Sequence, residues 1–100
     1  MPRIQYELEG LTKAQQRAWS YILEYARGTG RRCFTYNDLS RFWPHASTRI
    51  NAQTLDRRVR ELVELRILER LKYQGQRGRT RARFCLRRDL FECFVEPFLG

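Results

Sequence analysis

The sequence predicts a small α+β fold that is mostly helical. Three segments space their apolar side chains as amphipathic helices do: 12–28, 35–43 and 51–65. Two later segments, 67–73 and 79–86, read as strands, and Gln74-Gly75-Gln76-Arg77-Gly78 between them supplies the turn of a β-hairpin. With 100 residues, 42% of them hydrophobic, we expect one domain over 1–100.

The first helix is predicted from its cap. Residues 1–10 alternate apolar and polar side chains, so we expect an extended arm there. Thr12 and Gln15 have the spacing of a capping box, which predicts a helix start. Gly28 and Gly30 then end the helix.

A second helix is predicted to begin at Thr35. Thr35 and Asp38 form a box-like cap, and Phe34 and Leu39 have the spacing of a hydrophobic staple around it. Pro44 ends this helix. The segment 31–34 before it is too short for an independent strand but could add to a sheet edge.

The segment 51–65 carries the clearest division into two faces. Asn51 is a good N-cap, and an apolar stripe follows it at Leu55, Val59 and Leu62. The opposite face is polar and carries Gln53, Arg57, Arg60 and Glu64. Such a helix can rest on a core while its outer face enters a groove.

The second hairpin strand alternates strictly, so apolar side chains face one way and arginines the other. Residues 88–100 are expected to form an additional C-terminal helix, with Asp89 as its cap.

The charge of the chain indicates a polyanionic partner. The formal net charge is +9, and 18 of the 20 basic residues are Arg. Between Arg70 and Arg88 there are eight basic residues and no acidic one. Guanidinium binds phosphate and guanine edges in bidentate fashion, so nucleic acid is the first candidate and an anionic membrane surface the second.

The stretch from Ile50 to Leu62, followed by Leu65-Arg66-Ile67-Leu68-Glu69-Arg70, resembles the recognition helix and first wing strand of the winged helix-turn-helix family. The resemblance covers residues 11–87, and small proteins of archaea and their viruses are similar in size and layout. It implies a three-helix core, a β-hairpin wing and an extra C-terminal helix. Arg66 stands where the family often has glycine, because the helix end there tends to need positive φ. Either Arg66 adopts that conformation at a cost of ~1 kcal/mol, or the turn differs locally. The link 44–49 is longer than the family's usual turn.

The resemblance also implies roles for individual side chains on double-stranded DNA. Four would read base edges in the major groove: Asn51, Gln53, Thr54 and Arg57. Four would contact the DNA backbone: Tyr36, Arg41, Arg58 and Arg60. Four on the wing would follow the backbone or enter the minor groove: Arg77, Arg79, Arg81 and Arg83.

The cysteine pattern argues against a metal site. Cys33, Cys85 and Cys93 include no CxxC pair, and His45 is the sole histidine. We expect three reduced, largely buried cysteines; the alternative is an inter-subunit disulfide through Cys93. The apolar C-terminal helix favours a homodimer, although it could instead fold back on the first helix.

The sequence excludes several function classes. It holds no apolar run of the roughly 20 residues that cross a bilayer. No secretory signal is recognisable, so we expect a cytoplasmic or nucleoid-associated protein, or one of the host cytoplasm if it is viral. Without a phosphate-binding loop or catalytic set, we expect no enzyme, cofactor or small-molecule ligand.

We therefore expect a sequence-specific, homodimeric transcription regulator that binds double-stranded DNA. An RNA-binding module and a protein-interaction module remain as alternatives.

Overall fold

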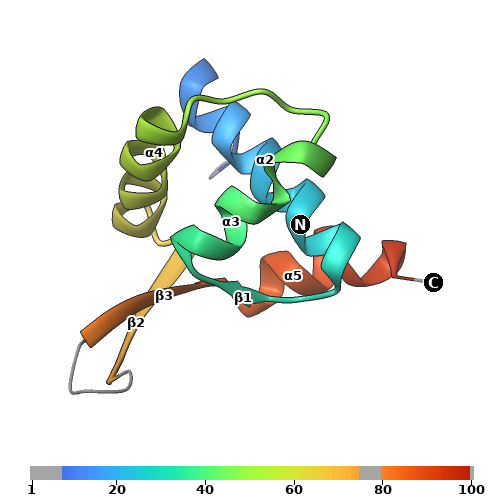
Figure 1. Ribbon diagram of the computed structural model, residues 1–100. Coiled ribbons are helices and arrows are strands. Elements are labelled where there is room, and N and C mark those ends of the chain that lie inside the picture. The colour runs from blue at the N-terminus through green and yellow to red at the C-terminus, as the bar shows by residue number, and fades with distance from the viewer. Residues whose placement is uncertain (1–7, 75–79, 100) are drawn as a thin grey trace.

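The structure is a computed structural model that describes residues 8–74 and 80–99 (Figure 1). Its α-helices, labelled as in Figure 1, are α2 (Lys13–Thr29), α3 (Tyr36–Phe42), α4 (Ala52–Glu64) and α5 (Arg88–Phe94). Its strands are β1 (Cys33–Phe34), β2 (Leu68–Gln74) and β3 (Thr80–Leu86). The short 3₁₀ turns are η1 (Trp43–His45) and η3 (Glu96–Phe98). These elements confirm an α+β class that is mostly helical. No described helix has the length and apolar character needed to span a membrane.

The three strands form one antiparallel sheet in the order β1-β3-β2. The hairpin register runs from Leu68 opposite Leu86 to Gln74 opposite Thr80. Leu68 and Leu86 are buried at the base of the hairpin, whose far end projects away from the helices (Figure 1). The short strand β1 thus adds to the sheet edge, as its sequence allowed.

Helix α2 supplies the central wall of the core. Ala18, Tyr21, Ile22 and Ala26 are fully buried along one side of it. The predicted capping box at its start is confirmed, because the Thr12 hydroxyl accepts from the Gln15 amide and the Gln15 side chain accepts from the Thr12 amide.

Helix α3 also starts as predicted. Thr35 and Asp38 form a reciprocal capping box. Phe34 and Leu39, on either side of the cap, are both fully buried. The buried Tyr21 hydroxyl donates to the Leu39 carbonyl at 2.5 Å, and this bond joins α3 to α2. Pro44 then lies in η1, directly after α3 ends.

Helix α4 packs on α2 through the predicted stripe of Leu55, Val59 and Leu62. It ends in a Schellman motif: the Ile67 amide donates to the Leu62 carbonyl and the Arg66 amide to Val63, both at 3.0 Å. Arg66 has φ 62°, so it adopts the left-handed conformation, which was one of the two alternatives at this position.

Both ends of the chain differ from expectation. Leu8 and Glu9 are helical, and Leu8 packs against the core rather than extending as an arm; residues 1–7 lie outside the described part. The predicted helix over 88–100 ends at Phe94, and Arg87 rather than Asp89 is its N-cap residue.

The C-terminal helix folds back on the first helix. Leu90 and Val95 are buried in the common core, and the Trp19 and Phe94 rings meet edge to face at 6.0 Å. Arg27 Nε donates to the Phe94 carbonyl at 2.9 Å. The apolar residues that suggested a dimer contact are therefore largely covered within one chain.

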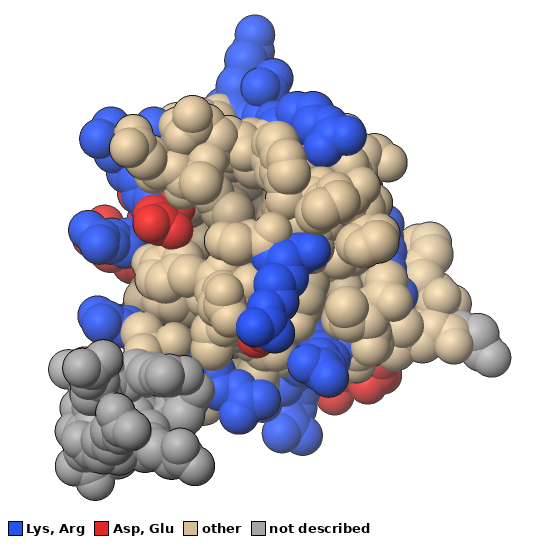
Figure 2. Space-filling view, viewed as in Figure 1, with Lys and Arg blue, Asp and Glu red and all other residues tan. Residues whose placement is uncertain are grey.

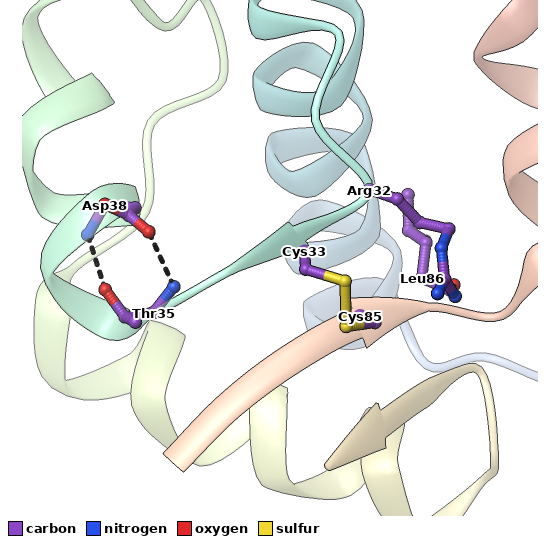
Figure 3. The surroundings of a disulfide bond; sticks show 6 residues. All are labelled: Arg32, Cys33, Thr35, Asp38, Cys85 and Leu86. Carbon is purple, nitrogen blue, oxygen red and sulfur yellow. Dashed lines mark hydrogen bonds between the residues drawn. A yellow bond between two sulfur atoms is a disulfide. The ribbon is translucent and has the colours of Figure 1, made fainter. Parts of the chain in front are cut away.

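A disulfide corrects the expectation of three reduced cysteines. Cys33 and Cys85 face each other in the β1–β3 register and are covalently joined (Figure 3). Beside the bond, Arg32 Nη1 donates to the Leu86 carbonyl at 2.9 Å. Strand β1 carries Cys33-Phe34 and strand β3 carries the reverse order, Phe84-Cys85. Antiparallel pairing therefore places the two cysteines opposite each other.

We predict that the disulfide stabilises the fold strongly. It closes a loop with a sequence separation of 52, and removing a crosslink of this kind lowers the free energy of unfolding by about 2–4 kcal/mol. The double variant Cys33→Ser/Cys85→Ser should show this loss in urea unfolding without reductant. Cys93→Ser, at the exposed free cysteine, is the matched control and should unfold like the parent protein. Equal stability of all three proteins would contradict the prediction.

A second prediction concerns the end of α4. Glycine at position 66 removes the Cβ that disfavours positive φ, so Arg66→Gly should raise the free energy of unfolding by about 1 kcal/mol. Arg66→Ala keeps the Cβ while removing the guanidinium, and it should bring no such gain. Urea unfolding of both variants measures the difference, and a gain in the alanine variant alone would refute the explanation.

Candidate nucleic-acid interface

The outer face of α4 carries exposed polar and cationic side chains. Gln53, Arg57 and Arg60 are exposed on the side opposite the buried stripe. Within the described part of the chain, the side chains of Arg57 and Arg60 make no hydrogen bond or ion pair. Their guanidinium groups are thus available to an external anion.

Arg58 differs from the other predicted DNA contacts of α4. It is half-buried and pairs with Glu61 at 2.6 Å, and Glu61 also accepts from Gln15 of α2 at 2.9 Å. The hydrogen bond from Arg58 lowers the pKa of the Glu61 carboxyl, and the bond from Gln15 adds to this effect. In this conformation the charge of Arg58 is paired with Glu61 and helps to hold α4 against α2, and its contact with the DNA backbone stays a prediction.

Two of the predicted base-reading residues, Asn51 and Thr54, have positions within the fold that differ from the exposed outer face. The Asn51 side-chain oxygen accepts from the Gln53 amide at 2.8 Å and caps α4. Thr54 is half-buried and turns toward α2 rather than lying on the outer face. Of the four predicted base readers, Gln53 and Arg57 are the pair with exposed side chains on the outer face.

The hairpin adjoins the C-terminal half of α4. A hollow of ≈ 390 Å³ separates them, and its walls come from α3, α4 and both strands of the hairpin: Tyr36, Arg60, Val63, Glu64, Arg70 and Phe84. Arg60 of α4 and Arg70 of β2 thus line the same space. Sequence reasoning placed no contact at Arg70, although the period of two along β2 could have assigned it to the side of Phe84, its register partner.

A neighbouring hollow extends this surface toward α3. It measures ≈ 810 Å³ and is lined in part by Arg41 and by Arg83 of β3. Tyr36 lines both hollows, and its ring packs edge to face on the Phe84 ring with the ring centroids 4.9 Å apart. Cations from α3, α4 and the hairpin are therefore arranged around one half-buried tyrosine.

The space-filling view agrees with this arrangement. Figure 2 shows basic side chains along the edge of the molecule formed by α4, directly above the hairpin. Arg77 and Arg79 lie outside the described residues. Arg81 pairs with Tyr73 in the strand register, and its side chain is likewise outside them. Arg83 is the predicted wing arginine whose exposed side chain is described.

The arginines in the described part of the chain are used in two ways. Some hold the fold together by bonds to carbonyl or carboxylate oxygens: Arg27, Arg32, Arg49, Arg58 and Arg87. Others are exposed and their side chains make no such bond among the described residues: Arg17, Arg31, Arg41, Arg57, Arg60, Arg66, Arg70, Arg83 and Arg88. Four of these line the two hollows beside the hairpin and Arg57 lies on the outer face of α4, where like charges repel unless an anion is present.

Cys93 is exposed and unpaired on α5. Its inter-subunit disulfide and the homodimer stay predictions. The described residues contain no cluster of three or more side chains that could hold a metal ion.

Comparison with known proteins assigns no role to this surface. No family model, curated protein or solved structure matches the chain. The charge and shape of the surface are therefore the basis for its interpretation.

The loop before α4 is fixed by a single carboxylate. Both oxygens of Glu24 accept backbone amides, from Ser47 at 2.7 Å and Thr48 at 2.8 Å. Partial burial raises the pKa of the Glu24 carboxyl, but the hydrogen bonds from Thr48 and Ser47 outweigh it and hold the pKa below its usual value. Ionised Glu24 thus positions the entry to α4 from the middle of α2.

We predict that Glu24→Gln lowers the free energy of unfolding at pH 7 by about 1–3 kcal/mol, because an amide oxygen cannot replace both acceptors. The folded-state pKa is depressed, so the contribution of Glu24 is complete above about pH 4.5 and is lost as pH falls through the folded pKa. The difference between parent and variant should therefore shrink on acidification. Urea unfolding between pH 7 and pH 3 measures it, with the exposed Glu92→Gln as control.

Proposed function

We propose that this protein is a winged helix-turn-helix module that binds double-stranded DNA and regulates transcription. In this proposal α4 enters the major groove and the β2–β3 hairpin is the wing. The supporting element order is helix, short strand, helix, helix and hairpin. The observation that carries the proposal is the set of arginines around Tyr36: Arg60 and Arg70 line one hollow beside it, and Arg41 and Arg83 line the next.

The outer face of α4 suits base reading. A single α-helix fits the major groove of B-DNA, which is about 12 Å wide. Gln53 and Arg57 lie one turn apart on the exposed side. Glutamine can pair with adenine and arginine with guanine, each through two hydrogen bonds. Because base edges differ between sequences, these contacts would give the protein a preferred site.

The remaining cations suit the phosphate backbone. Arg41, Arg70 and Arg83 come from α3 and the hairpin, and they flank α4 rather than sharing its outer face. Contacts of this kind set the register of a protein on DNA and carry no sequence information themselves. They should make binding strongly dependent on salt concentration, since each neutralised phosphate releases counterions.

The proposal is tested by selecting bound duplexes from a random pool at about 100 mM salt, where the Debye length is about 10 Å. Enrichment of one motif supports base reading. A-form RNA has a narrow major groove that α4 cannot enter, so an RNA hairpin of matched length should bind more weakly. Tighter binding to RNA, or no enriched motif, would overturn the proposal.

We predict different effects for two arginines. Arg57→Ala should lose about 1–3 kcal/mol of discrimination at one base pair of the selected site and leave binding to random duplex nearly unchanged. Arg83→Ala should weaken binding to both duplexes equally and reduce the salt slope by about one. Fluorescence anisotropy over a range of salt concentrations measures both effects.

The matched control is Arg31→Ala, at an exposed arginine in the α2–β1 loop on the side of the molecule away from α4 (Figure 1). Of the three variants, Arg31→Ala should change the salt slope least. Identical behaviour of the Arg57 and Arg83 variants on selected and random duplexes would exclude base reading by α4.

A further inference from the structure

A third hollow lies at the opposite end of α4 from the hairpin. It has a volume of ≈ 500 Å³ and lies between the first turns of α2, the turn η1 and the start of α4. Six of its residues carry polar or aromatic groups: Lys13, Arg17, Trp43, Arg49, Asn51 and Thr54. None of these residues except Asn51 and Thr54 was assigned a role from the sequence.

The charged side chains that line this hollow are all positive. Lys13, Arg17 and Arg49 are exposed, and no carboxylate lines the space with them. The two hollows near the hairpin differ, because Glu64 lines one and Asp38 the other. Three cations around one concave surface raise the local concentration of anions. The chemistry of the hollow therefore points to an anionic ligand.

The fold holds the parts of the hollow in place. Lys13 and Arg17 are four residues apart on α2 and so lie on the same helix face. Arg49 Nη1 donates to the Trp43 carbonyl at 3.3 Å, and its guanidinium lies over the Trp43 ring at 5.2 Å. The loop between them is anchored by Glu24. Little reorganisation is needed before an anion binds.

The hollow is continuous with the start of α4. Asn51 both lines it and caps the helix, and the exposed Gln53 is two residues further on. Backbone amides at the beginning of a helix favour negative charge and add to the side-chain cations. An anion held here would lie beside the proposed base-reading face, not on a separate part of the molecule.

We propose that this hollow binds backbone phosphates of the DNA strand that borders the major groove on the side opposite the hairpin. The inference rests on the proposed function and extends it to a second phosphate site. Helix α4 has 13 residues and is about 20 Å long, which exceeds the groove width of about 12 Å. Its two ends can therefore contact opposite strands. Figure 2 shows basic side chains at the end of the molecule where, in the same view, Figure 1 places the start of α2.

The first test uses Trp43 as an internal reporter. Its side chain is 38% exposed, whereas Trp19 is 8% exposed, so acrylamide quenching of fluorescence reports mainly on Trp43. Binding of the selected duplex should reduce the quenching constant at least twofold. Trp43→Phe identifies the signal, and inorganic phosphate and dAMP are the comparison ligands. Unchanged quenching on saturation with duplex would overturn the inference, as would protection by dAMP alone.

The second test removes charge from the hollow. The variant Lys13→Gln/Arg17→Gln should lower the salt slope by about two and weaken binding to selected and random duplexes by the same factor. Base preference should stay unchanged. The matched control, Arg31→Gln/Arg88→Gln, also removes two exposed charges, but from residues outside all three hollows. Circular dichroism and urea unfolding check that each variant is folded.

The outcomes separate the two proposals. If the Lys13/Arg17 variant matches the control while Arg57→Ala and Arg83→Ala impair binding, the phosphate site is wrong and the DNA-binding function stands. If the parent protein binds no duplex above the level of a neutral protein, both proposals fail. A salt slope reduced in the hollow variant and not in the control supports the second phosphate site.

Discussion

The burial of one stripe on α4 determines how the remaining surface of the protein is arranged. Val59 and Leu62 are fully buried and Leu55 nearly so, and each contributes about 1.5–3 kcal/mol relative to exposure. A rotation of α4 by one residue would replace this apolar stripe with polar and charged side chains, such as Thr54, Arg58 and Glu61 in one direction. Burial of such charges is unfavourable without partners. Burial of the apolar stripe therefore places Arg57 and Arg60 on the solvent-exposed face of α4.

Features encoded within a few residues of one another could be predicted from the sequence. The caps at Thr12, Thr35 and Asn51 depend on side chains two or three positions from the amides they satisfy, and all three are confirmed. The hairpin likewise follows from a period of two and a turn rich in glycine. The positive φ of Arg66 was one of two alternatives that the family resemblance left open, the other being a locally different turn.

Features that depend on residues distant in the sequence were missed or left open. The partner of Arg58 is local, but Glu61 is oriented by Gln15, which is 46 residues away. Likewise, α5 packs its apolar side chains against α2, a contact that the sequence could not distinguish from one with a second chain. Helix periodicity identifies an apolar face without identifying what covers it.

The Cys33–Cys85 bond divides the chain into a covalent ring and two tails. Helices α3 and α4 and the hairpin lie inside the ring, whereas α2 and α5 lie outside it and clasp each other through Arg27 and Phe94. A protease that cuts anywhere between the two cysteines would leave a single molecule of unchanged mass apart from the added water. Cleavage between Arg27 and Cys33, or between Cys85 and Phe94, would instead separate one partner of the α2–α5 contact from the ring.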